Sequence, residues 1–278
     1  NSMMNMWSPY NCMMTFYWSR TASMVYAGER DGLGFRDSLQ DMLGAMALDT
    51  AEAGRRIELL LTGQLANGGA MPVVKPFAHH PGHEKEPEHY RADDCMWFFN
   101  AIPEYVKETG DIAFYRKVLP FADKGEATVL GHLRRAIQFN LDRLGAHGLP
   151  CGLHADWNDC LRLGEKGETS FVAFQLRFAL REYIAISDML DEPQEAAWAR
   201  NILADYDRTL DAQVWDGEWY LRAYRYDGLK FGSKENEEGF IFMNPQVWAV
   251  ISGHAQGEKA RQCIDAMDRH LFTEHGVM

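Results

Sequence analysis

Apolar residues recur along most of the chain at intervals of three and four, the spacing that places them on one side of an α-helix. This pattern predicts helices over residues 38–48, 52–61, 93–108, 111–119, 126–144, 169–190, 194–214, 245–253 and 258–271. Residues 10–27 are apolar and aromatic nearly all round and predict a helix that is buried on every side. We therefore expect a mainly α-helical fold in which residues 169–214 form a helical hairpin.

Long polar connections separate several of the predicted helices. Residues 67–91 contain four prolines, and residues 145–168 join two of the longer helical segments. Residues 217–229 alternate aromatic and polar side chains, which predicts a short β-hairpin. Loops of this length inside a compact domain are usually functional or disordered. A ring of paired helices has this layout, with short turns at one end and long, pocket-building loops at the other.

Composition narrows the classes of protein that fit. The 278 residues are 46% hydrophobic and 24% charged, which suits one large domain or two small ones. A net charge of −12 leaves no basic stripe for phosphate backbones and argues against general nucleic-acid binding. No apolar run approaches the roughly 20 residues that cross a bilayer, so we expect no membrane association. Five scattered cysteines without a C-x-x-C pair predict reduced thiols in a cytoplasmic protein.

Motifs for common cofactors are missing from the sequence. There is no P-loop, no G-x-S-x-G and no G-x-G-x-x-G after a predicted strand. The four histidines between residues 79 and 89 match neither the H-x-x-x-H spacing nor a thiolate site for zinc. We therefore expect no nucleotide or flavin cofactor and no metal.

The sequence ADWNDC, residues 155–160, places two carboxylates three positions apart around Trp157 and Asn158. An indole offers a flat apolar face to a sugar ring, and an amide both donates and accepts hydrogen bonds. A carboxylic acid beside an indole can have its pKa raised by desolvation, which keeps a proton available for a leaving oxygen. These residues fit a polyhydroxylated ligand, and they fit equally well a structural loop in which Asp156 caps a turn and Trp157 fills the core.

Three further clusters carry candidate binding residues. In GERDGLGFRDSLQD, glycines surround Arg30, Arg36 and Asp37 and allow a ligand to approach closely, although Asp37 also suits a helix N-cap. Asp94 stands at a predicted helix start, where the helix dipole alone favours an acid. Glu237 belongs to an acidic run that suits either a solvated turn or sugar hydroxyls.

Several motifs together resemble the inverting glycoside phosphorylases of glycoside hydrolase family 94, which include cellobiose and N,N'-diacetylchitobiose phosphorylases. They are NMWSPYNC, TFYWSR, GERDGLGFRDSLQD, GGAMPVVKPFAH, YRADDCMWFFNAI, ETGD, ADWNDC and NEEGFIFMNPQVWAVISG. The resemblance runs from Trp7 to about Gly276. It implies an (α/α)6 barrel that cleaves a β-linked disaccharide with inorganic phosphate, giving an α-sugar 1-phosphate and a free sugar. Phosphate is then a substrate, and no cofactor is required.

The resemblance also implies roles for individual residues. The predicted catalytic residue is Asp159, the last of the D-W-N-D motif, as general acid. The predicted substrate-binding residues are Arg30, Arg36, Asp37, Asp94, Asp156, Trp157 and Glu237. An inverting hydrolase needs an acid and a base, whereas phosphate dianion is already a nucleophile, so one acid suffices. We therefore expect Asp156 to be structural or to orient its neighbours.

Alternatives to a phosphorylase remain open from the sequence. One is an inverting hydrolase on the same barrel with Asp37 or Glu237 as base, and another is an inactive sugar-binding piece. The sugar is also open among cellobiose, diacetylchitobiose and cellobionic acid.

The length of the chain departs from that of the family, whose members carry an N-terminal β-sandwich before this region. They also carry further barrel helices and a C-terminal β domain after it, with the phosphate-binding residues. We expect residues 1–278 to be a part of the catalytic barrel that is incomplete by itself. A homodimer is expected, in which another chain could complete the barrel.

Overall fold

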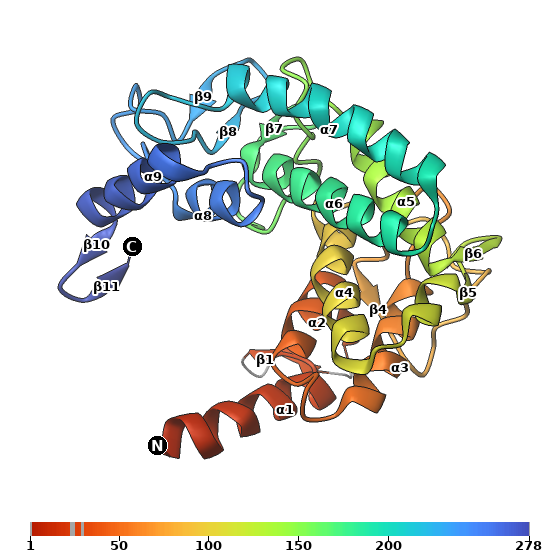
Figure 1. Cartoon of the computed structure of the whole chain (residues 1–278). Helices are drawn as coiled ribbons and strands as arrows, with labels where there is room; N and C mark the ends of the chain where they lie inside the picture. Colours follow the sequence, from red (N-terminus) through yellow and green to blue (C-terminus); the bar gives the residue numbers. More distant parts are fainter. Residues whose placement is uncertain (1, 23–25, 29–30, 278) are drawn as a thin grey trace. The chain divides into compact units, whose positions relative to one another are not determined.

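The computed structural model describes residues 2–22, 26–28 and 31–277, and it divides into two compact units. Residues 1–90 and 94–139 form the first unit, and residues 91–93 and 140–278 form the second. The helices of the first unit are α1 (Ser8–Trp18), α2 (Phe35–Leu43), α3 (Thr50–Leu61), α4 (Phe98–Thr109) and α5 (Val129–Leu141), whose last two residues belong to the second unit. The helices of the second unit are α6 (Ser170–Met189), α7 (Pro193–Gln213), α8 (Met243–Ile251) and α9 (Gly257–His270). The predicted mainly α-helical fold is confirmed (Figure 1).

The strands are short and pair as antiparallel ladders. In the first unit they are β1 (Thr21–Ala22) with β2 (Tyr26–Ala27), β3 (Leu33–Gly34) with β4 (Val73–Val74), and β5 (Val118–Pro120) with β6 (Glu126–Thr128). In the second they are β7 (Glu168–Thr169), β8 (Ala223–Tyr224) and β9 (Lys230–Phe231) in one sheet, and β10 (Phe272–Thr273) with β11 (Gly276–Val277). The expected hairpin within residues 217–229 is therefore realised by β8 and β9, slightly later in the sequence.

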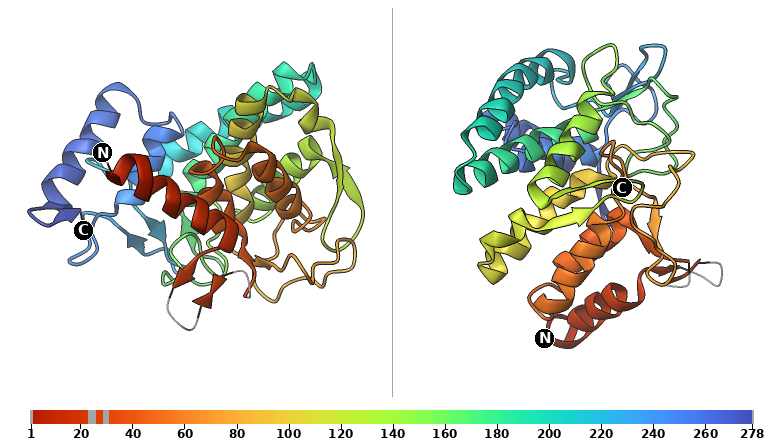
Figure 2. Two further views of the ribbon diagram at one scale, coloured as in Figure 1. Left: turned by 90° about the horizontal axis from the view of Figure 1, so that it is seen from below. Right: turned by 90° about the vertical axis from the view of Figure 1, so that its right-hand side faces the viewer.

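The core of the first unit forms where α4 packs against α2 and α3 (Figures 1 and 2). Phe35 of α2 meets Phe98 of α4 edge to face with their ring centroids 5.3 Å apart, and both are buried. Asp49 accepts a hydrogen bond from the Glu52 amide and caps α3. A 3-10 turn, Asp94–Trp97, leads into α4 and contacts α2.

Three helical predictions are wrong in part, and one of them is the helix over 126–144, which begins only after β6, as α5. The predicted helix over 10–27 ends at Trp18 because Ser19 has a φ of 62°, outside the helical region, and β1 and β2 follow. Nor is this helix buried on every side, since Phe16 is the residue of α1 that is buried. The segment 111–119 forms a 3-10 helix, Ile112–Arg116, followed by β5.

The helical hairpin of the second unit is confirmed, with α6 and α7 packed side by side along their lengths (Figure 1). Pro193 begins α7, where its missing amide hydrogen costs nothing because that group has no partner within the helix. Most of the first turns of α6 are buried, including Phe171 and Phe174.

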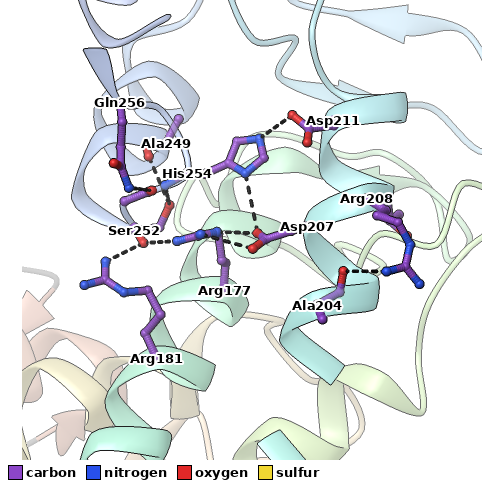
Figure 3. Close-up of polar contacts among 12 residues, drawn as sticks. Arg177, Arg181, Ala204, Asp207, Arg208, Asp211, Ala249, Ser252, His254 and Gln256 are labelled. Carbon is purple, nitrogen blue, oxygen red and sulfur yellow. Dashed lines mark hydrogen bonds and ion pairs between the residues drawn. The ribbon is translucent and has the colours of Figure 1, made fainter. Parts of the chain in front are cut away.

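A polar cluster joins α6, α7 and the end of α8 (Figure 3). Arg177 donates from Nε to Asp207 Oδ1 at 2.6 Å and from Nη1 to the Ser252 carbonyl, which also accepts from Arg181 at 2.7 Å. Ser252 caps α8 at its C-terminal end, where unpaired carbonyls and the helix dipole favour cations. Burial would raise the pKa of Asp207, but His254 and Arg177 hold it below its ordinary value. This cluster fixes α8 on the hairpin.

Candidate active site

The loop that carries the D-W-N-D motif is anchored from inside by Asp156. Its carboxylate is buried and lies 2.6 Å from Nη1 of Arg222, which is itself buried. Nη2 of Arg222 donates to Oδ1 of Asp156 at 2.7 Å, and the Thr169 hydroxyl donates to Oδ2 at 2.6 Å. Arg222 immediately precedes β8, and Thr169 belongs to β7. The sheet of the second unit therefore holds the D-W-N-D loop.

The Asp156 carboxylate is held in its charged form. Burial would raise its pKa, but the Arg222 guanidinium, the Thr169 hydroxyl and the Asn158 amide together lower it below the ordinary value. Each of these groups stabilises the anion, and each lies within the second unit. A buried, ion-paired carboxylate of this kind fits the expected structural role better than direct contact with a sugar.

The two aspartates of the motif face different surroundings. The Asn158 amide donates to Asp156 Oδ1 at 2.9 Å, and the Cys160 amide donates to Asn158 Oδ1 at 3.0 Å, so two successive side-chain turns shape the loop. Trp157 is 44% exposed, and the Asp159 side chain is 58% exposed. The motif is therefore a loop and not a helical turn with both acids on one face.

Arg91 pairs with the exposed aspartate. Its Nε donates to Oδ1 of Asp159 at 3.1 Å. The backbone of Arg91 forms bridges with Leu153 and Ala155, and the next amide, that of Ala92, donates to the Ala155 carbonyl at 3.0 Å. Sequence reasoning missed both Arg91 and Arg222, although Arg91 stands inside the motif YRADDCMWFFNAI.

The predicted residues of the first unit gather at the start of α2. Asp37 lies in the first turn and pairs with Arg20, whose Nη1 is 3.0 Å away, and Arg20 also pairs with Asp41 at 2.8 Å. Gly34 occupies the N-cap position, so the capping alternative for Asp37 is wrong. Arg36 is buried beside Asp37 in the same turn. Arg30 lies outside the described residues.

The remaining candidates lie on separate elements. Asp94 is buried in the 3-10 turn that contacts α2, in the first unit. Glu237 is exposed on the loop after β9, in the second unit. That loop is held by Asp216, which accepts hydrogen bonds from the Ser233 hydroxyl and the Lys234 amide, each at 2.8 Å. The structure thus brings Asp156, Trp157 and Asp159 together in one unit, and Arg36 and Asp37 with the Asp94 turn in the other.

A cavity of about 630 Å³ lies at the stems of the D-W-N-D loop, between Cys151, Lys166, Glu168, His147 and the hairpin around Tyr226. Glu168 is buried and accepts from the His147 ring at 2.5 Å and from the His147 and Leu149 amides at 2.9 and 3.0 Å. Successive residues of a strand face opposite sides, so β7 directs Glu168 to this cavity and Thr169 to Asp156. Strand β7 therefore holds both the start of this connection, at His147 and Leu149, and the motif itself, at Asp156.

Neither a metal-binding cluster nor a membrane-spanning helix is found among the described residues. Among the described residues, no three His, Cys, Asp or Glu side chains gather closely enough to hold a metal ion. Within the described ranges, no helix has both the length and the apolar character needed to cross a membrane.

Comparison with known proteins places the chain in a family. The model of the glycosyl hydrolase 94 superfamily catalytic domain matches residues 1–278. The chain belongs to this family. An N,N'-diacetylchitobiose phosphorylase from Vibrio proteolyticus is 33% identical over 299 residues, which cover 100% of this chain and 37% of that protein. A solabiose phosphorylase from Paenibacillus borealis is 34% identical over 91% of this chain and 32% of its own length.

Other similarities are more distant. A cellobionic acid phosphorylase from Neurospora crassa is 29% identical over 87% of this chain and 31% of that protein. The chain therefore spans about a third of the length of the curated relatives it matches. A rhamnosidase from Klebsiella oxytoca with rhamnose bound shares the fold, with a TM-score of 0.59 and 16% identity over 86% of this chain and 42% of that chain.

Proposed function

We propose that this chain is part of the catalytic (α/α)6 barrel of a phosphorylase. The enzyme cleaves a β-linked disaccharide with inorganic phosphate and gives an α-sugar 1-phosphate and a free sugar. Membership of family 94 and the names of the three phosphorylase relatives support this reaction class. The paired helices α6 and α7, with the D-W-N-D loop before them and the Glu237 loop after them, support the barrel.

The observation that carries the proposal is the asymmetry of the two aspartates in one loop. Asp159 is exposed beside an exposed indole, where its carboxyl group is accessible to a glycosidic oxygen. Asp156 is buried and ion-paired with Arg222, so it is not accessible as a base for water. The loop therefore offers one working carboxyl group, which is what a phosphorylase requires because phosphate itself attacks the anomeric carbon.

Each residue then has a distinct task in the proposed reaction. Asp159 donates its proton to the leaving oxygen as the glycosidic bond breaks. Trp157 provides a flat surface for a sugar ring. Arg36, Asp37 and Asp94, with Arg30 and Glu237, are proposed to bind sugar hydroxyls, and Asp156 orients the loop. A homodimer and a cytoplasmic location stay predictions.

The experiment that tests this function incubates the protein containing these residues with cellobiose, N,N'-diacetylchitobiose or cellobionic acid, with and without phosphate. Sugar 1-phosphate that forms only with phosphate is the expected result. Equal release of reducing sugar without phosphate would instead indicate a hydrolase with Asp37 or Glu237 as base. Asp159→Asn should abolish turnover, and Cys160→Ser, an exposed neighbour in the same loop, should retain it.

A further inference from the structure

The exposed aspartate of the D-W-N-D loop is the only one of the two acids proposed to lose its proton during turnover, and it faces a cation. Arg91 Nε lies 3.1 Å from Asp159 Oδ1, with 29% of the Arg91 side chain and 58% of the Asp159 side chain exposed. An exposed pair of this kind often contributes little, because ordering two long side chains costs entropy. What distinguishes this pair is how its arginine is held.

The backbone of Arg91 is paired with the start of the D-W-N-D loop. It forms bridges with both Leu153 and Ala155, and the Ala92 amide donates to the Ala155 carbonyl. Arg91 is therefore fixed relative to the residue just before Asp156. Asp156 holds the loop from its buried side, and Arg91 contacts its exposed acid, Asp159. Arg91 and Asp159 lie 68 positions apart in the sequence.

We propose that Arg91 is a positioning residue for Asp159, holding its carboxyl group toward the leaving oxygen and stabilising the carboxylate that remains after proton transfer. This rests on the proposed phosphorolysis. In that step a phosphate oxygen forms a bond to the anomeric carbon while the glycosidic carbon–oxygen bond breaks. The leaving oxygen keeps the electron pair and takes the proton of Asp159. Asp159 then regains a proton, through solvent, from the phosphate group of the product.

Arg91 is assigned to the acid and not to phosphate because of the inverting geometry. The nucleophile and the general acid of an inverting enzyme act on opposite faces of the anomeric centre. A guanidinium in contact with the acid therefore lies on the leaving-group side, where it cannot also bind the attacking phosphate.

The test compares two substrates with the same donor sugar. One is the disaccharide, whose leaving oxygen needs a proton, and the other is the dinitrophenyl β-glycoside, whose leaving group needs none. For Arg91→Gln we expect kcat/KM with phosphate to fall about fivefold to tenfold on the disaccharide and to stay unchanged on the dinitrophenyl glycoside. Arg91→Lys, which keeps the charge, should recover part of the loss.

Arg162→Gln is the matched control, since it removes a positive charge from the same loop. Arg162 donates to the His154 carbonyl, a backbone group that gives no proton to the leaving oxygen, so its effect should be equal on both substrates. Equal losses on both substrates for Arg91→Gln would show a merely structural role and overturn the proposal, as would an unchanged kcat/KM on the disaccharide.

A second readout does not depend on the aryl substrate. The alkaline limb of the pH dependence of kcat/KM on the disaccharide should move to higher pH in Arg91→Gln, because the lost cation no longer favours the carboxylate. An unmoved limb contradicts the proposal. Wild-type protein that makes no sugar 1-phosphate would refute the phosphorolysis itself, whereas normal wild-type turnover with unaffected Arg91 variants refutes only the role of Arg91.

Discussion

Replacing Arg222 by methionine should loosen the D-W-N-D loop by a predictable amount. The change removes the cation from an ion pair whose two side chains are each 1% exposed. Removing one partner of a buried pair typically costs about 3–5 kcal/mol, because the remaining charge is left uncompensated. Thr169 and the Asn158 amide still donate to Asp156 in the variant, so we expect a cost at the lower end, about 3 kcal/mol.

Hydrogen exchange measures this cost locally, without requiring the whole protein to unfold in one step. The amides of Asn158 and Cys160 donate to oxygens of the loop and report its opening. A loss of about 3 kcal/mol accelerates their exchange roughly a hundredfold or more. The control is Arg225→Met, which removes an exposed arginine just after β8 that pairs with Asp227 and should leave these amides unchanged.

A double variant, Arg222→Met with Asp156→Asn, sharpens the test. It should lose less protection than the two single variants added together, because neither charge is then left buried alone. The reasoning is refuted if Arg222→Met changes exchange less than about threefold, or if the two losses simply add.

Three further predictions concern other parts of the chain. Trp157→Ala should raise KM for the disaccharide more than it lowers kcat, since a stacked ring binds substrate and transition state alike; steady-state kinetics with unchanged KM would contradict this. Burial lowers the pKa of His132 to about 4. Between about pH 6.5 and pH 4 the unfolded chain therefore binds a proton at this residue and the folded chain does not. The contribution of His132 to the free energy of unfolding should be fully present above about pH 6.5 and decrease towards pH 4. Urea unfolding of His132→Gln at several pH values should lack this part of the decrease. Gly145→Ala should lower the melting temperature, because its Cβ would lie 2.4 Å from the carboxyl carbon of Glu168; an unchanged melting temperature counts against that packing.

The helices that the sequence predicted well combine apolar residues at intervals of three and four with turn or capping residues at their ends. Residues 169–214 show both, with Pro193 at the start of the second helix, and α6 and α7 follow the prediction closely. Residues 10–27 lack a polar face, so periodicity could not separate a helix from the strands that follow it. The break depends on the backbone of Ser19, which no apolar pattern encodes.

The sequence predicted the acid and the aromatic residue of the site, but not the arginines that surround them. The resemblance pointed to Asp159, and the aromatic neighbour was evident from the motif itself. The different surroundings of Asp156 and Asp159 depend on Arg222 and Arg91, which lie 66 and 68 positions away from their partners. Contacts over such separations follow from the packing of the sheet and the long loop, which local sequence does not encode.

The most direct test of phosphorolysis with Asp159 as acid follows the oxygen atoms. The protein containing this chain turns over a β-linked disaccharide with ordinary phosphate in water enriched in ¹⁸O, and mass spectrometry and NMR examine the donor sugar. We predict an α-sugar 1-phosphate without ¹⁸O at the anomeric carbon, formed by wild-type protein and not by Asp159→Asn. A free donor sugar that carries ¹⁸O at the anomeric carbon would show that water is the nucleophile and would contradict the account.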